Sequence, residues 1–133
     1  MKRVLVFGTF DILHPGHLYF FKQSKKYGNF LIVSLAREKY IRKIKGRKAF
    51  HTETARKKLL EALKIIDKVV LGSKGDYIGH ILSQNPEVIA LGYDQKAFTE
   101  GLEKKLAKRG WKGKIVKISA YQPSIYKSSK FLR

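Results

Sequence analysis

Five short apolar runs, separated by stretches with helical periodicity, limit the fold of this 133-residue chain more than any other feature. The runs comprise residues 4–7, 30–35, 69–71, 88–91 and 114–118. Continuous runs rich in Val, Ile and Leu are typical of strands that are buried on both faces of a parallel sheet. Strands that alternate with helices predict a single α/β domain over residues 1–133, built on a doubly wound, five-stranded parallel sheet.

Start and stop signals mark the helices between these runs. Pro15 can begin the first helix, and Thr52 can cap another, whose expected apolar stripe contains Leu59, Ala62, Leu63 and Ile66. Further helices are expected at residues 78–82 and from Phe98 to the stop at Gly110. Residues 39–48 are basic and show no clear period, so we expect a mobile loop there.

The charge balance indicates an anionic partner. Lys and Arg number 29 and Asp and Glu number 10, which gives a formal net charge of +19. The absence of cysteine excludes disulfides, thiol nucleophiles and cysteine-ligated metals. No apolar stretch approaches the roughly 18 residues that a membrane span needs, so we expect a cytoplasmic protein without a signal peptide or a membrane partner.

The loop after the first run carries the clearest chemical signal. Residues 8–17 read Gly-Thr-Phe-Asp-Ile-Leu-His-Pro-Gly-His and lead into a helix, where doubly wound folds bind ligands. The stretch is neither a P-loop nor a dinucleotide fingerprint. Free N–H groups at the helix start and the i, i+3 pair His14 and His17 should face an anion, and Gly8 and Gly16 would let the backbone approach a nucleotide.

Other interpretations of these histidines stay open at this point. His14 and His17 could be ordinary surface or core residues, or zinc ligands with Asp11 as a third, although the motif offers no fourth His or Cys. His51 and His80 are interpreted as ordinary surface residues.

The ten residues of this loop resemble the signature of the nucleotidylyltransferases named for their H-x-G-H motif, in particular the cytidylyltransferase-like branch. Three further segments are similar to that branch in order and spacing: residues 49–57, 91–94 and 128–130. The resemblance covers essentially the whole chain. It implies a Rossmann-like fold, transfer of a nucleotidyl group to a phosphate, a divalent metal such as Mg²⁺ that bridges the nucleotide phosphates, and a homodimer.

Two groups within the branch suit a chain of this length. Archaeal-type FAD synthases, which join AMP from ATP to FMN, are similar in residues 41–48 and 91–95. Glycerol-3-phosphate cytidylyltransferases, which use CTP and a phosphorylated alcohol, usually carry Arg-Thr-Glu-Gly-Ile-Ser-Thr near the end. Residues 121–129 lack that arginine and glycine, so the resemblance favours FMN adenylyltransferase with ATP and FMN as partners.

The resemblance also implies roles for individual residues. Thr9 would contact the nucleotide through its backbone and Phe10 through its ring, while His14 and His17 would donate to the α- and β-phosphates. Lys43 and Lys45 would act in catalysis by closing over the triphosphate. Arg56, expected on the charged face opposite Leu59 and Leu63, would bind a phosphate with its guanidinium. The remaining expected nucleotide-binding residues are Gly8, Pro15, Gly16, Gly92, Asp94, Tyr121, Ser128 and Ser129.

A basic nucleic-acid-binding module is the competing, non-enzymatic hypothesis, because the chain combines its positive charge with seven Tyr and eight Phe. The basic residues are spread along every expected helix, and no nucleic-acid recognition motif is present. The sequence therefore favours the enzyme.

Overall fold

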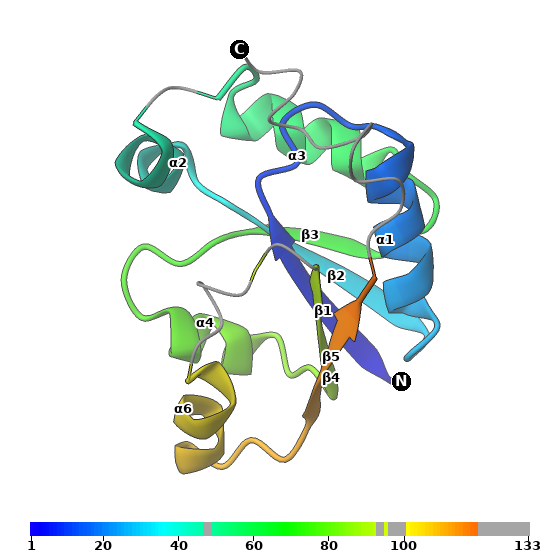
Figure 1. Ribbon diagram of the computed structural model, residues 1–133, viewed down its shortest axis with the longest axis vertical. Helices are drawn as coiled ribbons and strands as arrows, with labels where there is room; N and C mark the ends of the chain where they lie inside the picture. The colour runs from blue at the N-terminus through cyan, green and yellow to red at the C-terminus, as the bar shows by residue number, and fades with distance from the viewer. Residues whose placement is uncertain (47–48, 93–94, 96–100, 120–133) are drawn as a thin grey trace.

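The computed structural model describes residues 1–46, 49–92, 95 and 101–119. Its strands are β1 (Arg3–Gly8), β2 (Phe30–Leu35), β3 (Lys68–Leu71), β4 (Val88–Gly92) and β5 (Lys114–Ile118). They form one sheet in the order β3-β2-β1-β4-β5, and every pairing is parallel (Figure 1). The expectation of a doubly wound, five-stranded parallel sheet is confirmed.

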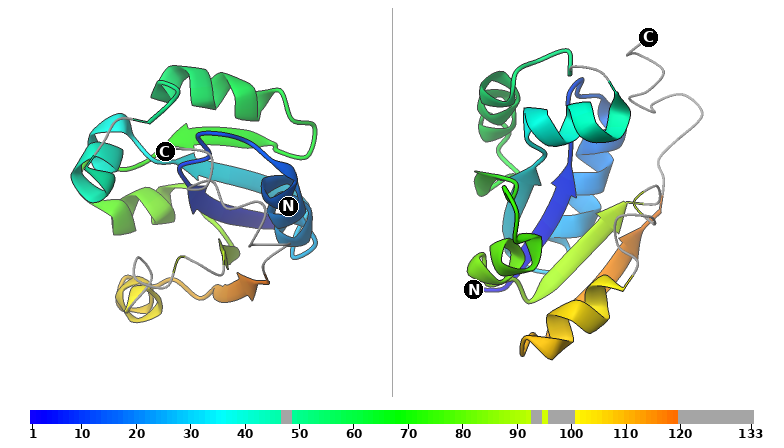
Figure 2. Two further views of the ribbon diagram at one scale, coloured as in Figure 1. Left: turned by 45° about the horizontal axis from the view of Figure 1, so that its top comes forward. Right: turned by 90° about the vertical axis from the view of Figure 1, so that its left-hand side faces the viewer.

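Helices cover both faces of this sheet (Figure 2). They are α1 (Pro15–Lys25), α2 (Glu38–Lys45), α3 (Glu53–Glu61), α4 (Tyr77–Ser83) and α6 (Leu102–Lys108). Alternate residues of each strand face opposite sides, so Val4 and Val6 pack with Phe21 of α1 and Leu60 of α3. Leu5 packs on the other face, in the cluster that contains residues of α4 and α6. α2 lies beyond the carboxyl ends of the strands.

The central strand β1 sets the position of the ligand crevice. It pairs with β2 on one side and β4 on the other, where strand order reverses. Gln95, which follows β4, bridges the carboxyl ends of β4 and β1: its Oε1 accepts from the Gly92 amide at 2.8 Å, and its Nε2 donates to the Phe7 carbonyl at 2.7 Å. Gln95 therefore lies against the carboxyl end of β1, and the expected contact between the loops after β1 and β4 stays a prediction.

The prediction of a mobile loop over residues 39–48 is wrong for its first seven residues, which belong to helix α2. Ile41 anchors this helix with only 2% of its surface exposed, while charged side chains face the solvent. Glu38 lies in the first turn, where the helix dipole favours a negative charge, and Gly46 ends the helix in the left-handed conformation. The many charged residues around Ile41 leave too weak an apolar period for the helix to be recognised from sequence.

Helix α3 begins as expected but faces the sheet differently. Thr52 caps it by accepting a hydrogen bond from the Ala55 amide at 3.1 Å. The expected apolar stripe is wrong at Leu59, which is 44% exposed while the neighbouring Leu60 is fully buried. Leu63 and Ile66, which follow the end of α3, do pack in the core as expected. Arg56, one turn before Leu60, therefore lies on the buried face and not on a charged outer face.

α6 ends at Lys108, two residues before Gly110, while Phe98 lies outside the described residues. Within the described ranges, the helices are too short or too polar to cross a membrane.

The packing of α3 predicts unequal losses of stability on truncation of two adjacent leucines. Leu60→Ala should lower the free energy of unfolding by about 2–5 kcal/mol, because it leaves a cavity between α3 and the sheet. Leu59→Ala should lower it by less than about 1 kcal/mol, since much of that side chain is in water. Urea denaturation of both variants measures the difference, and equal losses would contradict the orientation of α3.

Candidate active site

The side chains of His14 and His17 both accept hydrogen bonds from backbone amides at the start of helix α1. His14 is the N-cap residue, and its Nδ1 accepts a hydrogen bond from the Gly16 amide at 3.1 Å. His17 Nδ1 in turn accepts from the His14 amide at 3.2 Å. Capping boxes are usually made by Ser or Thr with Glu or Gln. Here two imidazoles make one, and their rings stack with centroids 3.9 Å apart.

The caps decide which nitrogen of each ring carries the proton. A ring nitrogen that accepts a hydrogen bond is unprotonated, so each neutral imidazole carries its hydrogen on Nε2. Burial lowers the pKa of His14. Burial and, secondarily, the charge of His14 lower the pKa of His17 to about 3. Both residues are therefore neutral at neutral pH and act as Nε2–H donors.

The expectation of free N–H groups at the start of α1 is wrong. Pro15 has no N–H, and the Gly16 amide donates to the His14 side chain. The amides of His17 and Leu18 donate to the His14 carbonyl at 2.9 and 3.4 Å. An anion at this helix end would therefore meet imidazole Nε2–H groups and the positive end of the helix dipole.

Phe10 supports the histidines from inside the protein. Its ring is 7% exposed and lies edge-on to His17, with centroids 5.3 Å apart, and it also packs on Phe20 and Phe21. A Cβ added at Gly8 would lie 2.5 Å from this ring. The expected contact between the Phe10 ring and a nucleotide is wrong in this structure, and the missing side chain of Gly8 makes room for the ring.

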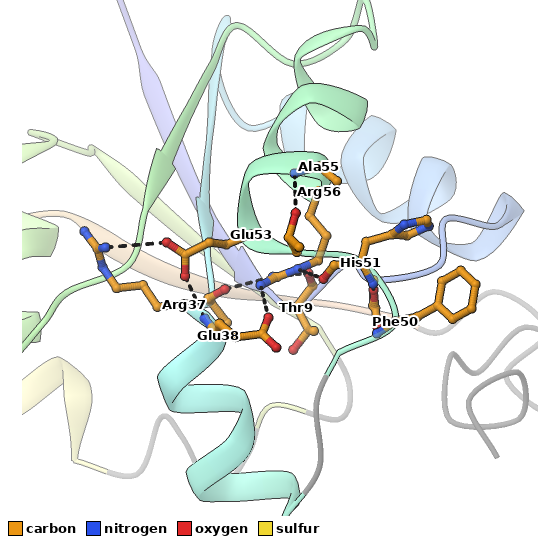
Figure 3. Close-up of polar contacts among 11 residues, drawn as sticks. Thr9, Arg37, Glu38, Phe50, His51, Glu53, Ala55 and Arg56 are labelled. Carbon is orange, nitrogen blue, oxygen red and sulfur yellow. Dashed lines mark hydrogen bonds and ion pairs between the residues drawn. The ribbon is translucent and has the colours of Figure 1, made fainter.

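Arg56 gathers the loops around the site (Figure 3). Its Nη1 donates to the carbonyls of Thr9 at 3.0 Å and Ala36 at 2.8 Å, and its Nε donates to the His51 carbonyl at 3.2 Å. These carbonyls belong to the loops after β1, after β2 and before α3. Because Arg56 is fully buried, the interpretation of this residue as an outer-face charge is wrong. The Thr9 backbone, which was expected to contact the nucleotide, accepts a hydrogen bond from Arg56 through its carbonyl.

Carboxylates compensate the buried charge of Arg56. Burial lowers its pKa, whereas Asp11, Glu38 and Glu53 raise it. Glu38 Oε2 lies 3.7 Å from Arg56 Nη2, and both atoms are buried without a hydrogen-bond partner. Glu53 Oε1 accepts from the Glu38 amide at 2.8 Å, and its other oxygen lies 3.8 Å from Arg37 Nη1. The start of α2 is thus joined electrostatically to α3.

Asp11 has a role in the site that the sequence did not predict, since the sequence indicated Asp11 only as a third zinc ligand. The Asp11 side chain is 1% exposed and accepts hydrogen bonds from the Phe50 amide and, at 2.7 Å, from the His51 amide. Asp often accepts from backbone amides in loops, which is a signal in the sequence. Nothing in the sequence identifies amides 39 and 40 positions later as its partners.

The other expected site residues are distributed unevenly. Lys43 is exposed on α2, Lys45 is the last residue of that helix, Pro15 is the first residue of α1, and Gly92 is the last residue of β4. The following residues lie outside the described part of the chain: Asp94, Tyr121, Ser128 and Ser129.

The other two histidines differ from each other. His80 is not an ordinary surface residue, because its Nε2 lies 2.8 Å from Ser34 Oγ. Burial lowers the pKa of His80, and the charge of Arg37 adds to that effect. His51 is partly buried, and its amide and carbonyl are bound by Asp11 and Arg56.

The low pKa of His17 predicts a loss of stability in acid. Between about pH 3 and pH 6.5 the unfolded chain binds a proton at this residue that the folded protein excludes, so stability falls as pH falls through that range. His17→Asn keeps an oxygen near the Nδ1 position but does not titrate. Its unfolding free energy should depend less steeply on pH, by up to about 1.4 kcal/mol per pH unit. Urea denaturation at several pH values measures both slopes, and identical slopes would contradict the neutral His17.

Comparisons with known proteins identify the family of the chain. The family model for cytidylyltransferase-like proteins matches residues 5–133. The chain is 44% identical over 120 residues to an FAD synthase of Ferroglobus placidus. The alignment covers 90% of this chain and 78% of that protein. It is 40% identical over 129 residues to an FAD synthase of Thermoplasma volcanium, covering 97% of this chain and 90% of the relative.

Solved structures show the same fold. The crystal structure of a protein from Thermoplasma volcanium, described as a lipopolysaccharide core biosynthesis protein, superposes with a TM-score of 0.86 at 41% identity. The alignment covers 92% of this chain and 99% of that one. A protein of unknown function from Archaeoglobus fulgidus, 19% identical with a TM-score of 0.71, shares the fold. Together with the histidine cap at the crevice, these matches show that the chain belongs to the cytidylyltransferase-like family.

Proposed function

We propose that this protein is an FAD synthase, which transfers AMP from ATP to the phosphate of FMN and releases pyrophosphate. The observation that carries the proposal is the pair of neutral, capped histidines at the edge of the sheet where β1 and β4 lie side by side. Several archaeal relatives named FAD synthase, between 40% and 45% identical over most of the chain, support ATP and FMN as the substrates.

The histidines suit the chemistry of this transfer. A phosphate oxygen of FMN attacks the α-phosphorus of ATP, and negative charge moves onto the departing pyrophosphate. His14 and His17 would donate their Nε2–H bonds to the phosphates as this charge shifts. Because the caps already orient both rings, they need no rearrangement when the reaction occurs. The attacking group is the substrate's own phosphate, so the reaction needs no protein nucleophile.

Helix α2 would supply positive charge at the leaving group. Lys43 and Lys45 belong to this helix, which lies beyond the carboxyl ends of the strands and is joined to α3 through Glu38. We propose that both lysines contact the triphosphate. Since residues 38–45 are helical, they would approach the nucleotide on one ordered element. Arg56 would act by holding the loops in place, because its donors bind backbone carbonyls.

A divalent metal would be bound mainly by the substrate. Within the described residues, no three His, Cys, Asp or Glu side chains group in a way that could hold a metal ion. Mg²⁺ is commonly held by nucleotide phosphates with one or two carboxylates and water. We propose that the metal enters with ATP and bridges its phosphates. We further propose that the enzyme acts as a homodimer.

Product formation tests the function directly. The purified protein, given FMN, ATP and Mg²⁺, should form FAD and pyrophosphate, both detectable by chromatography and a coupled pyrophosphate assay. CTP with glycerol 3-phosphate serves as the competing pair. Formation of CDP-glycerol without FAD would show that the protein is a cytidylyltransferase.

Two substitutions at His17 separate its role in capping the helix from its role as a hydrogen-bond donor. His17→Asn can keep the acceptor for the His14 amide but has no donor at the Nε2 position, so kcat should fall by about 100-fold or more while the protein stays folded at pH 8. His17→Gln can place an amide N–H near the Nε2 position and should recover part of the rate. Steady-state kinetics and circular dichroism check both variants. Turnover near the wild-type rate in folded His17→Asn would mean that the imidazole is purely structural.

A further inference from the structure

Residues 50 and 51 form a fixed ledge beside the histidine loop. The amides of Phe50 and His51 both donate to Asp11, which precedes His14 by three residues. The His51 carbonyl accepts from Arg56 Nε at 3.2 Å. The backbone of this ledge is therefore bound to the loop that carries the histidines, through a carboxylate that is 1% exposed.

The side chain of Phe50 lies outside these contacts. It is 72% exposed and meets the His51 ring edge-on with centroids 4.8 Å apart. Figure 3 shows its ring projecting away from the Arg56 contacts. A single exposed apolar side chain is ordinary. What is unusual is an exposed aromatic ring on backbone that hydrogen bonds fix next to a proposed active site.

Other aromatic residues in the described part of the chain are engaged elsewhere. Phe7, Phe10 and Phe21 are buried in the core. Tyr27 contacts Lys114, the first residue of β5, at the opposite edge of the sheet. Tyr40 on α2 is the remaining exposed ring near the carboxyl ends of the strands, with 46% of its surface exposed.

Three further aromatic side chains contact residues in other parts of the molecule. Tyr77 lies under Lys105, and Trp111 donates its indole N–H to the Pro86 carbonyl at 2.8 Å. Phe30 lies under Arg3 at the start of β2. These rings pack beside α6 or at the amino ends of the strands, away from the His14 loop.

We propose that the Phe50 ring is the surface on which the isoalloxazine ring of FMN stacks during adenylyl transfer. The inference rests on the proposed function and assigns a specificity role within it. Isoalloxazine is a large, flat ring system that loses its hydration on one face when it stacks on an aromatic side chain. Phe50 offers such a face on a backbone segment that Asp11 and Arg56 hold in place, so little backbone freedom is lost on binding.

The placement also suits the other end of the acceptor. FMN carries its phosphate on a flexible ribityl chain, so a ring held on Phe50 leaves the phosphate to reach the donors of the His14 loop. Exposed cations of α2, Lys39 and Lys43 among them, add positive charge near the carboxyl ends of the strands. An exposed aromatic ring and basic side chains at the same end of the sheet suit a ligand that carries an aromatic ring and a phosphate.

Kinetics with four variants test this role. Phe50→Ala should raise KM for FMN about fivefold or more, since loss of a stacking ring typically has an effect of that size, and should change KM for ATP less than twofold. Phe50→Trp should restore KM and should quench flavin fluorescence on FMN binding more strongly than the wild-type protein does. Leu59→Ala, a partly exposed apolar side chain on α3, is the matched control, and Tyr40→Ala tests the other exposed ring.

The outcomes separate this inference from the function on which it rests. If the wild-type protein makes no FAD, both are wrong. If it makes FAD but Phe50→Ala keeps its KM for FMN, or raises KM for ATP equally, the stacking role is wrong and the function stands. An effect on FMN confined to Tyr40→Ala would move the platform to α2. A change of sedimentation coefficient in Phe50→Ala with unchanged KM would make Phe50 an interface residue instead.

Discussion

The burial of the Arg56 guanidinium is the constraint on which the arrangement of the site depends. A charged group without water is costly unless it is hydrogen-bonded and compensated, and Arg56 achieves this with loop carbonyls and nearby carboxylates. The same contacts bring the loops after β1 and β2 to the segment before α3. The planar, five-donor shape of guanidinium makes this possible, whereas a lysine ammonium could not reach several carbonyls in one plane.

The histidine pair shows how one side chain can serve both local structure and chemistry. In each ring Nδ1 accepts a hydrogen bond at the start of the helix, and Nε2 carries the hydrogen that would be donated to a phosphate in the proposed reaction. A Ser and Glu box would satisfy the helix equally well but would offer a carboxylate to an incoming phosphate. Replacing it by imidazoles gives the same cap without placing negative charge at the anion site. The low pKa values follow from this packing, since Phe10 and the neighbouring ring exclude water from His17.

The elements that could be predicted from sequence are those whose pattern extends over several residues. The strands were placed to within about one residue, because buried parallel strands are continuous apolar runs with glycine at some ends. Helix α2 was missed because charged residues surround the buried Ile41, and the orientation of α3 was missed because Leu59 and Leu60 are adjacent and equally apolar. His14 and His17 lie at the start of the helix that follows β1, as the sequence predicts, and their part in binding phosphate stays a prediction. The long-range partners of Asp11 and Arg56 could not be found, because only the folded chain brings those loops together.

The contact between Gly8 and Phe10 has a consequence for variation of the motif. The ring of Phe10 fills the space that a side chain at position 8 would occupy, and the same ring meets His17 edge-on. The two positions therefore share a single volume. A chain that gained a methyl group at position 8 would have to reduce the residue at position 10, and the imidazole behind it would lose its support. Positions 8 and 10 are thus expected to change together or not at all over the evolution of such chains.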